Sequence, residues 1–147
     1  MKKIIIILLP IILFSLSSLA QEEKEISIAF YNLENLFDTV DSNNAGDFDW
    51  TPGGKKIWNT KRYNRKLNNL AFVIEKLDGD KNSPGPDLLG FCEVENRSVV
   101  EDLIKTKPIV EANYEVVHYE GSDKRGIDVG LLYRKDNFEL IHSKSYK

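Results

Sequence analysis

Hydrophobic and polar positions along the first half of the chain predict a strand, a long polar loop and a helix. Residues 26–32 are rich in β-branched and aromatic residues, which indicates a strand that ends at a polar loop running to about residue 59. Between residues 60 and 77 apolar residues recur mostly three and four positions apart, which is typical of an amphipathic helix. Asp78 and Gly79 end this helix.

The second half of the chain predicts three further strands and a short helix. A turn at residues 84–86 precedes a strand at 87–93. Ser98 is followed three positions later by Glu101, which has the form of a capping box and predicts a helix that ends by Pro108. Two strands, at 114–119 and 127–134, are joined by the turn-rich sequence GSDKRG as a hairpin. The order of elements predicts an α/β or α+β domain.

The first twenty residues have the three-part pattern of a secretory signal. Two lysines precede an apolar run at residues 4–14, and the small residues Ser18 and Ala20 stand before the expected cleavage point. The alternative is an uncleaved membrane anchor, but Pro10 interrupts the run, which is shorter than the roughly 18 residues of a spanning helix. We therefore expect a secreted or periplasmic protein whose domain occupies residues 21–147 and has no stable membrane anchor.

Composition indicates one ordinary globular domain and excludes a low-complexity or disordered chain, since 41% of the residues are hydrophobic and 29% charged. Removal of the signal leaves 18 basic against 23 acidic residues, a formal charge of -5. Such a chain has no bulk attraction to nucleic acid or anionic lipid, so a polyanionic substrate would need a local basic patch or a metal ion. One cysteine and two histidines exclude a disulfide framework and a Cys/His zinc cluster. Cys92 is expected to be a buried core thiol.

One basic patch is present at the entry of the expected long helix. Its six cations are interleaved with Trp58 and Tyr63: Lys55, Lys56, Lys61, Arg62, Arg65 and Lys66. A phosphate-backbone contact and a solvated helix face both remain open for this patch. The loop before it only approximates an EF-hand, because Ala45 and Pro52 occupy ligand positions. A looser cation site using Asp47 and Asp49 is a further alternative to a solvated loop.

Two of the expected strands end in oxygen-bearing side chains. Alternation places Asn32 on the face of Phe30, and Glu34 joins that face if the chain stays extended. In the second strand Glu93 shares a face with Phe91. If the strands are neighbours, about 4.8 Å apart, Asn32 and Glu93 could meet at the mouth of the core. A strand that simply surfaces at its end is the alternative.

Three segments together resemble the endonuclease/exonuclease/phosphatase family of DNase I-like metal-dependent phosphoesterases. They are YNLENLFD at 31–38, DLLGFCEVENR at 87–97 and SDKRGIDVGLLYR at 122–134. The segment KRYNRKLNNLAFVI at 61–74 also looks like the first long helix of secreted bacterial members. The resemblance covers essentially the whole mature chain. It implies an α/β fold, the DNase I-like four-layer α/β sandwich, of which this chain would hold the N-terminal half.

The resemblance also implies roles for particular residues. Asn32 matches the Asn that helps organise the metal and the substrate phosphate, and Glu93 matches the metal-binding Glu, although a cysteine precedes it where Gln is common. Glu34 stands where some relatives place a second acidic residue on the same strand face, as a further candidate metal ligand. Arg125 and Asp128 lie in the hairpin that approaches the substrate site in relatives. The implied cofactor is Mg²⁺, or Mn²⁺ or Ca²⁺ in its place. One carboxylate assisted by an amide is a plausible protein contribution to an Mg²⁺ site.

The implied activity is metal-assisted hydrolysis of a phosphate ester, foremost by a nuclease or phosphodiesterase, with nucleic acid as one candidate substrate. The family's general base belongs to a His/Asp pair supported by a GDxN motif, but neither histidine lies in an SDH-like sequence, and Gly46-Asp47-Phe48 lacks the Asn. Both His118 and His142 are therefore expected to be ordinary strand or surface residues. Our hypothesis is that the 147-residue chain alone is inactive.

Two alternatives belong to other classes. One is a secreted, non-catalytic binding module that keeps the fold and uses the basic segment 55–66. The other is a complete hydrolase that uses His118 in a different site. The sequence predicts no protein partner, and it leaves the substrate open among nucleic acids, nucleotides, lipids and sugar phosphates.

Overall fold

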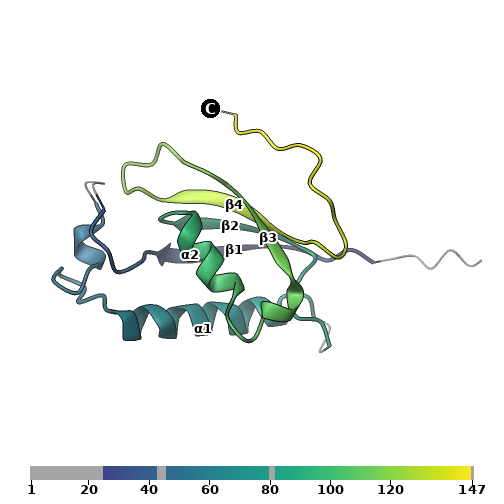
Figure 1. Ribbon diagram of the computed structural model, residues 1–147, viewed down its shortest axis with the longest axis horizontal. Helices are drawn as coiled ribbons and strands as arrows, with labels where there is room; N and C mark the ends of the chain where they lie inside the picture. Colours follow the sequence, from purple (N-terminus) through teal and green to yellow (C-terminus); the bar gives the residue numbers. More distant parts are fainter. Residues whose placement is uncertain (1–24, 43–45, 80–81, 147) are drawn as a thin grey trace, which may run out of the picture.

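The described part of the chain forms one mixed sheet with both of its α-helices on the same side (Figure 1). The computed structural model describes residues 25–42, 46–79 and 82–146. The expected signal at residues 1–20 therefore lies outside the described residues. Among those residues, no helix has the length and apolar character required to cross a membrane.

The sheet has the strand order β1-β2-β4-β3, with the bounds Ile28–Leu36 (β1), Leu88–Val94 (β2), Asp128–Arg134 (β4) and Tyr114–Tyr119 (β3). β1 and β2 are parallel, and the long helix α1 (Thr60–Lys76) lies between them in sequence, as a parallel crossover requires. β4 is antiparallel to both β2 and β3. The expected hairpin is confirmed, and the α/β fold class is that of the DNase I-like sandwich, with one sheet and one helical layer described here.

The first strand is longer than its alternation predicts. β1 continues past Asn32 because Leu33 and Leu36 are fully buried and keep the strand on the core. Its pairing with β2 shifts register between Asn32 and Leu36, where Glu34 and Asn35 adopt positive φ angles of 53° and 59°. The expected strand end is therefore a β-bulge inside a longer strand.

Both helices form where the sequence predicts them, but the residue that caps the second helix is not the predicted one. Asn59 caps α1 by accepting a hydrogen bond from the Arg62 backbone. The second helix, α2 (Arg97–Ile104), is capped by Asn96, whose Oδ1 accepts from Val99 N at 3.1 Å. The expected capping box at Ser98 is wrong, since the Ser98 hydroxyl instead donates to Asn96 Oδ1 at 2.6 Å. Two 3₁₀ turns complete the elements, at Phe48–Trp50 and Val110–Ala112.

The two faces of the sheet differ in burial. Leu89, Phe91 and Leu132 are fully buried beneath the helices and form the centre of the core. On the opposite face, which we call the open face, Ile28 and Phe30 of β1 are 73% and 69% exposed. Residues paired across strands share a face, and Phe30 pairs with Gly90 rather than with Phe91. The apolar stretches before Asn32 and Glu93 thus lie on opposite faces, contrary to the sequence-based expectation.

Candidate functional site

Glu93 is the residue at which β2 departs from regular pairing. Cys92 pairs with Val129 and Val94 pairs with Asp128, so Glu93 is the extra residue of a bulge. Its φ of 62° is left-handed, a conformation that costs a non-glycine residue of order 1 kcal/mol and that clusters at functional sites. The bulge turns the Glu93 side chain away from the course that alternation predicts.

The Glu93 carboxylate faces a hollow beside the β3–β4 loop. Its side chain is 23% exposed, and its oxygen Oε1 lies 4.0 Å from Arg125 Nη1. The hollow has a volume of about 360 Å³ and is also lined by Cys92 and Asp123. The Asp123 carboxylate accepts hydrogen bonds from Arg125 Nε at 3.1 Å and from Arg125 Nη2 at 3.0 Å. This pairing lowers the pKa of the Asp123 carboxyl and holds the charged guanidinium beside the hollow. The structure thus brings Glu93 and Arg125 to one hollow.

Asn32 and Glu34 lie on the neighbouring strand. Asn32 pairs with Cys92, which places it beside the residue that precedes Glu93. The Asn32 side-chain oxygen accepts a hydrogen bond from Glu34 N at 2.6 Å and so stabilises the bulge of β1. The Glu34 residue is exposed, and its left-handed backbone breaks the extended course on which the shared face with Asn32 depended.

Lys66 of α1 is a site residue that the motifs did not single out. Its ammonium donates to the backbone carbonyls of Glu34 and Asn35 in the β1 bulge. Burial lowers the Lys66 pKa, and the nearby carboxylates of Glu34 and Glu93 oppose that effect. Sequence reasoning counted Lys66 only as one cation of the basic patch, because nothing local shows which turn of α1 meets the end of β1.

Oxygen donors dominate the ends of β1 and β2 at Asn32, Glu34 and Glu93, which we call the Glu93 edge. A hard divalent cation requires such donors. Glu93 and Glu34 offer carboxylates, and Asn32 offers an amide oxygen with a second lone pair. The Arg125 contact at 4.0 Å exceeds hydrogen-bond length, so it leaves the Glu93 oxygens available to a ligand. The residue types therefore fit Mg²⁺ or Mn²⁺.

Cys92 lies next to this edge and is half-buried rather than part of the core. It pairs with Asn32 on one side and with the exposed Val129 on the other, so it belongs to the open face. Burial, assisted by the charge of Glu93, raises the pKa of the thiol. The raised pKa disfavours the thiolate and agrees with an unreactive cysteine.

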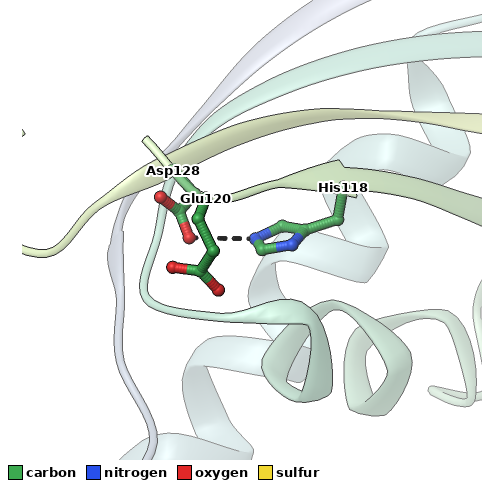
Figure 2. Close-up of side chains that lie close together, drawn as sticks. All are labelled: His118, Glu120 and Asp128. Atoms are coloured by element: carbon green, nitrogen blue, oxygen red, sulfur yellow. Dashed lines mark ion pairs between the residues drawn. The ribbon is translucent and has the colours of Figure 1, made fainter. Parts of the chain in front are cut away.

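Asp128 borders the Glu93 hollow, but its carboxylate turns toward β3. The side chain is 4% exposed, and Oδ2 lies 3.0 Å from His118 Nε2 (Figure 2). Its other oxygen accepts a hydrogen bond from Gly121 N at 2.5 Å. His118 is a strand residue, as expected, yet its side chain is only 5% exposed. His142 is exposed.

The His118–Asp128 pair is a feature that the sequence reasoning missed. A signal for it existed in the hairpin register, where His118 pairs with Gly130. Asp128 stands two residues before that glycine and therefore on the same face of the sheet.

A basic groove adjoins the Glu93 edge. Its volume is about 400 Å³, and it is lined by Tyr31, Glu34, Trp58, Arg62, Arg65, Lys66, Asn69, Leu70 and Val73. Aromatic rings support its cations, since the Arg62 guanidinium lies 5.5 Å from the Trp58 ring centroid. Lys56 likewise lies 4.5 Å from the Trp50 ring. Glu34 and Lys66 connect this groove to the β1 bulge.

Glu95 and Asn96 connect β2 to α2, as expected from the motif. Glu95 N donates to Leu36 O at 3.0 Å, and the Glu95 carboxylate accepts from Asp38 N at 2.8 Å. Burial raises the Glu95 pKa to about 7, and the charges of Asp38 and Asp47 add to the increase. Asp47 is itself buried and accepts from Ser42 N at 2.8 Å.

Comparison with known proteins gives one family. The model of the Endonuclease/Exonuclease/phosphatase family matches residues 27–147, which includes all of the strands and helices described above. No curated protein and no solved structure matches the chain.

Proposed function

Because the chain belongs to the endonuclease/exonuclease/phosphatase family, we propose that it supplies the metal-binding edge of a divalent-metal-dependent phosphoesterase. The reaction class is hydrolysis of a phosphate ester, foremost a phosphodiester as in a nuclease or phosphodiesterase. The observation that carries this proposal is the Glu93 carboxylate, held in a left-handed bulge 4.0 Å from Arg125. Left-handed residues cluster at functional sites, and this one leaves its carboxylate accessible to a ligand.

In this proposal Glu93 and Asn32 bind the ion, with Glu34 as an additional donor. A bound Mg²⁺ or Mn²⁺ would neutralise charge on the phosphoryl and leaving oxygens. Arg125 would orient the same phosphate group, since its planar guanidinium can donate to two oxygens at once and Asp123 steadies it. Lys66 supports the metal edge by binding the carbonyls of the β1 bulge.

The same proposal includes export, and it includes turnover that depends on further, water-activating groups. The pattern of the first twenty residues supports a secreted or periplasmic location. Neither His118 nor His142 stands in an SDH-like sequence that would provide the water-activating group, although residues 79–82 read GDKN. We therefore expect the 147-residue chain to bind metal and phosphate without turnover.

The first test measures metal binding by the chain. Isothermal titration with MnCl₂ is expected to give one site at the Glu93 edge, and Glu93→Gln is expected to weaken it by at least about tenfold, since a charged ligand is lost. Glu111→Gln is the matched control, because Glu111 is an exposed carboxylate before β3, away from the site. Equal Mn²⁺ affinity in all three proteins would contradict the assignment of Glu93.

The second test addresses the reaction. Hydrolysis of bis(p-nitrophenyl) phosphate is followed with and without Mg²⁺ or Mn²⁺, and the chain is expected to match the buffer blank. Metal-dependent hydrolysis that is lost in Glu93→Ala would support the phosphoesterase and overturn the inactivity of the chain. Binding of a phosphorothioate dinucleotide that depends on Mn²⁺ and Arg125 would support the proposed substrate class; its absence would count against it.

The second candidate is a binding module, which the basic groove favours. Its cations Arg62 and Arg65 stand beside Trp58, an arrangement suited to a phosphate backbone with stacked bases. In this case a single-stranded oligonucleotide binds without added metal, and Arg62→Ala with Arg65→Ala weakens binding while Glu93→Gln does not. If the chain is instead the proposed phosphoesterase, binding requires added metal and is weakened by Glu93→Gln.

A further inference from the structure

The His118–Asp128 pair leaves two buried polar atoms without hydrogen-bond partners. His118 Nε2 and Asp128 Oδ2 lie 3.0 Å apart, and both side chains are at least 95% buried. The contact nevertheless falls outside hydrogen-bond geometry, so neither atom has a hydrogen-bond partner. A buried polar atom in that condition costs about 1–3 kcal/mol. A third group that binds both atoms would satisfy them.

Glu120 completes a set of three donors around that point. One atom each from His118, Glu120 and Asp128 lies within 4.8 Å of the others, and Figure 2 shows the three side chains converging from β3, from the residue that follows it and from the start of β4. The hairpin explains the convergence, because Tyr119 pairs with Val129 and the next positions outward are Glu120 and Asp128. His118 lies two residues before Glu120, on the same face.

The spacing of the donors suits a small divalent ion. Two ligands bound at about 2.1 Å are separated by roughly 3.0 Å when about 90° apart, as in octahedral coordination, and by roughly 3.4 Å when about 110° apart, as in tetrahedral coordination. The 3.0 Å between Nε2 and Oδ2 falls at the lower end of that range. Glu120 is exposed, so its side chain can adjust to complete the set while water fills open positions.

The backbone also fixes the direction of the Asp128 carboxylate. Oδ1 accepts from Gly121 N at 2.5 Å, which leaves Oδ2 aimed at His118. A Cβ at Gly121 would lie 3.1 Å from that Oδ1, so the glycine permits the close approach of the backbone. Hydrogen bonds that orient a ligand carboxylate in this way are typical of metal sites.

The donor set selects a class of metal that differs from that of the Glu93 edge. An imidazole nitrogen with two carboxylates favours Zn²⁺ and similar imidazole-binding ions, whereas Mg²⁺, Ca²⁺ and Mn²⁺ prefer oxygen ligands. Among the residues that the structure describes, Glu93 does not belong to this group of donors. We propose that His118, Glu120 and Asp128 bind a divalent transition-metal ion such as Zn²⁺, which fastens the β3–β4 hairpin independently of the metal at Glu93.

The experiment titrates the chain with ZnCl₂ by calorimetry and repeats the titration with CoCl₂, whose visible absorption reports the ligand set. We expect one Zn²⁺ site, and a thermal unfolding midpoint that rises with Zn²⁺ because the ion binds only the folded hairpin. Glu120→Gln is expected to weaken Zn²⁺ binding by at least about tenfold. Because Glu120 is exposed, this variant keeps the fold, and His118→Gln provides the second ligand test.

Three control variants make the outcome decisive. His142→Gln removes the other, exposed histidine, and Glu115→Gln removes a carboxylate from the opposite face of β3. Both are expected to leave Zn²⁺ affinity unchanged, as is Glu93→Gln. Absence of Zn²⁺ binding, or equal affinity in the His118 and Glu120 variants, would overturn the proposal. If Zn²⁺ binding were lost only in Glu93→Gln, the ion would belong to the Glu93 edge instead.

Discussion

Two carboxylates of one short segment, Glu93 and Glu95, have opposite surroundings. Glu93 stands in a strained bulge beside Arg125 and is open to a ligand. Glu95 is 5% exposed and accepts a hydrogen bond from the Asp38 backbone. The bulge at Glu93 produces this difference, because it shifts the register by one residue and turns the two side chains into different environments.

Glu95 makes stability depend on pH. Its pKa of about 7 in the folded chain exceeds the ordinary 4.5, so the folded state holds the proton more tightly than the unfolded state. Stability is therefore fully present below about pH 4.5, falls as the pH rises to about 7 and is flat above, with a total change of at most about 3 kcal/mol. Urea unfolding at about pH 5 and about pH 8 measures the change.

Glu95→Gln is the matched variant for this prediction, since the amide resembles the protonated acid in shape. It is expected to abolish the decline between the two pH values, whereas Glu139→Gln, at an exposed position, is expected to retain it. A decline of the same size in Glu95→Gln would assign the pH dependence to other groups.

At the scale of elements, the cap of α2 shows why local patterns can mislead. Two residues can cap this segment, and both are good N-caps. The bulged end of β2 and the Glu95–Asp38 contact set where the chain turns, and this places Asn96 at the cap position. Ser98 then lies inside the first turn, and Glu101 binds Arg97 at 2.7 Å instead of closing a capping box.

The cap predicts a clear contrast between two alanine variants. Asn96→Ala is expected to lower the free energy of unfolding by about 1 kcal/mol, because Val99 N loses its acceptor. Ser98→Ala is expected to cost less than about 0.5 kcal/mol, since its hydroxyl only donates to the cap residue. Denaturant unfolding of both variants measures the difference, and the reverse order would restore the capping box.

The same reasoning separates what the sequence could predict from what it could not. The two hairpin strands and α1 follow from local periodicity, and the sequence predicts the bounds of all three to within one residue. The end of β1 was misplaced because its bulge follows from pairing with β2, a contact distant in sequence. At the candidate site the residue types were predictable, but the inward turn of Asp128 depends on the register of the whole hairpin.

At the scale of the whole molecule, the sheet has one covered and one open face. The helices cover Phe91, while on the open face Phe30 lies over Gly90, where an added Cβ would meet its ring at 2.6 Å. The segment after β4 contributes a partial cover near β3, where the Tyr119 hydroxyl donates to Ser143 Oγ at 2.5 Å. Ile28, Phe30 and Val129 nevertheless remain 58–73% exposed. An apolar surface of this kind drives association.

Two phenylalanine substitutions distinguish the faces. Phe91→Ala is expected to lower the free energy of unfolding by about 3–5 kcal/mol, because it opens a cavity in a fully buried site. Phe30→Ser is expected to cost less than about 1 kcal/mol, since the ring is already 69% exposed, and to reduce self-association in sedimentation velocity. Phe48→Ser, at a ring 57% exposed outside the sheet, is expected to leave association unchanged. If Phe30→Ser instead destabilised the chain as strongly as Phe91→Ala, the open face would have to be covered in solution, and the protein would present only its helical side to solvent.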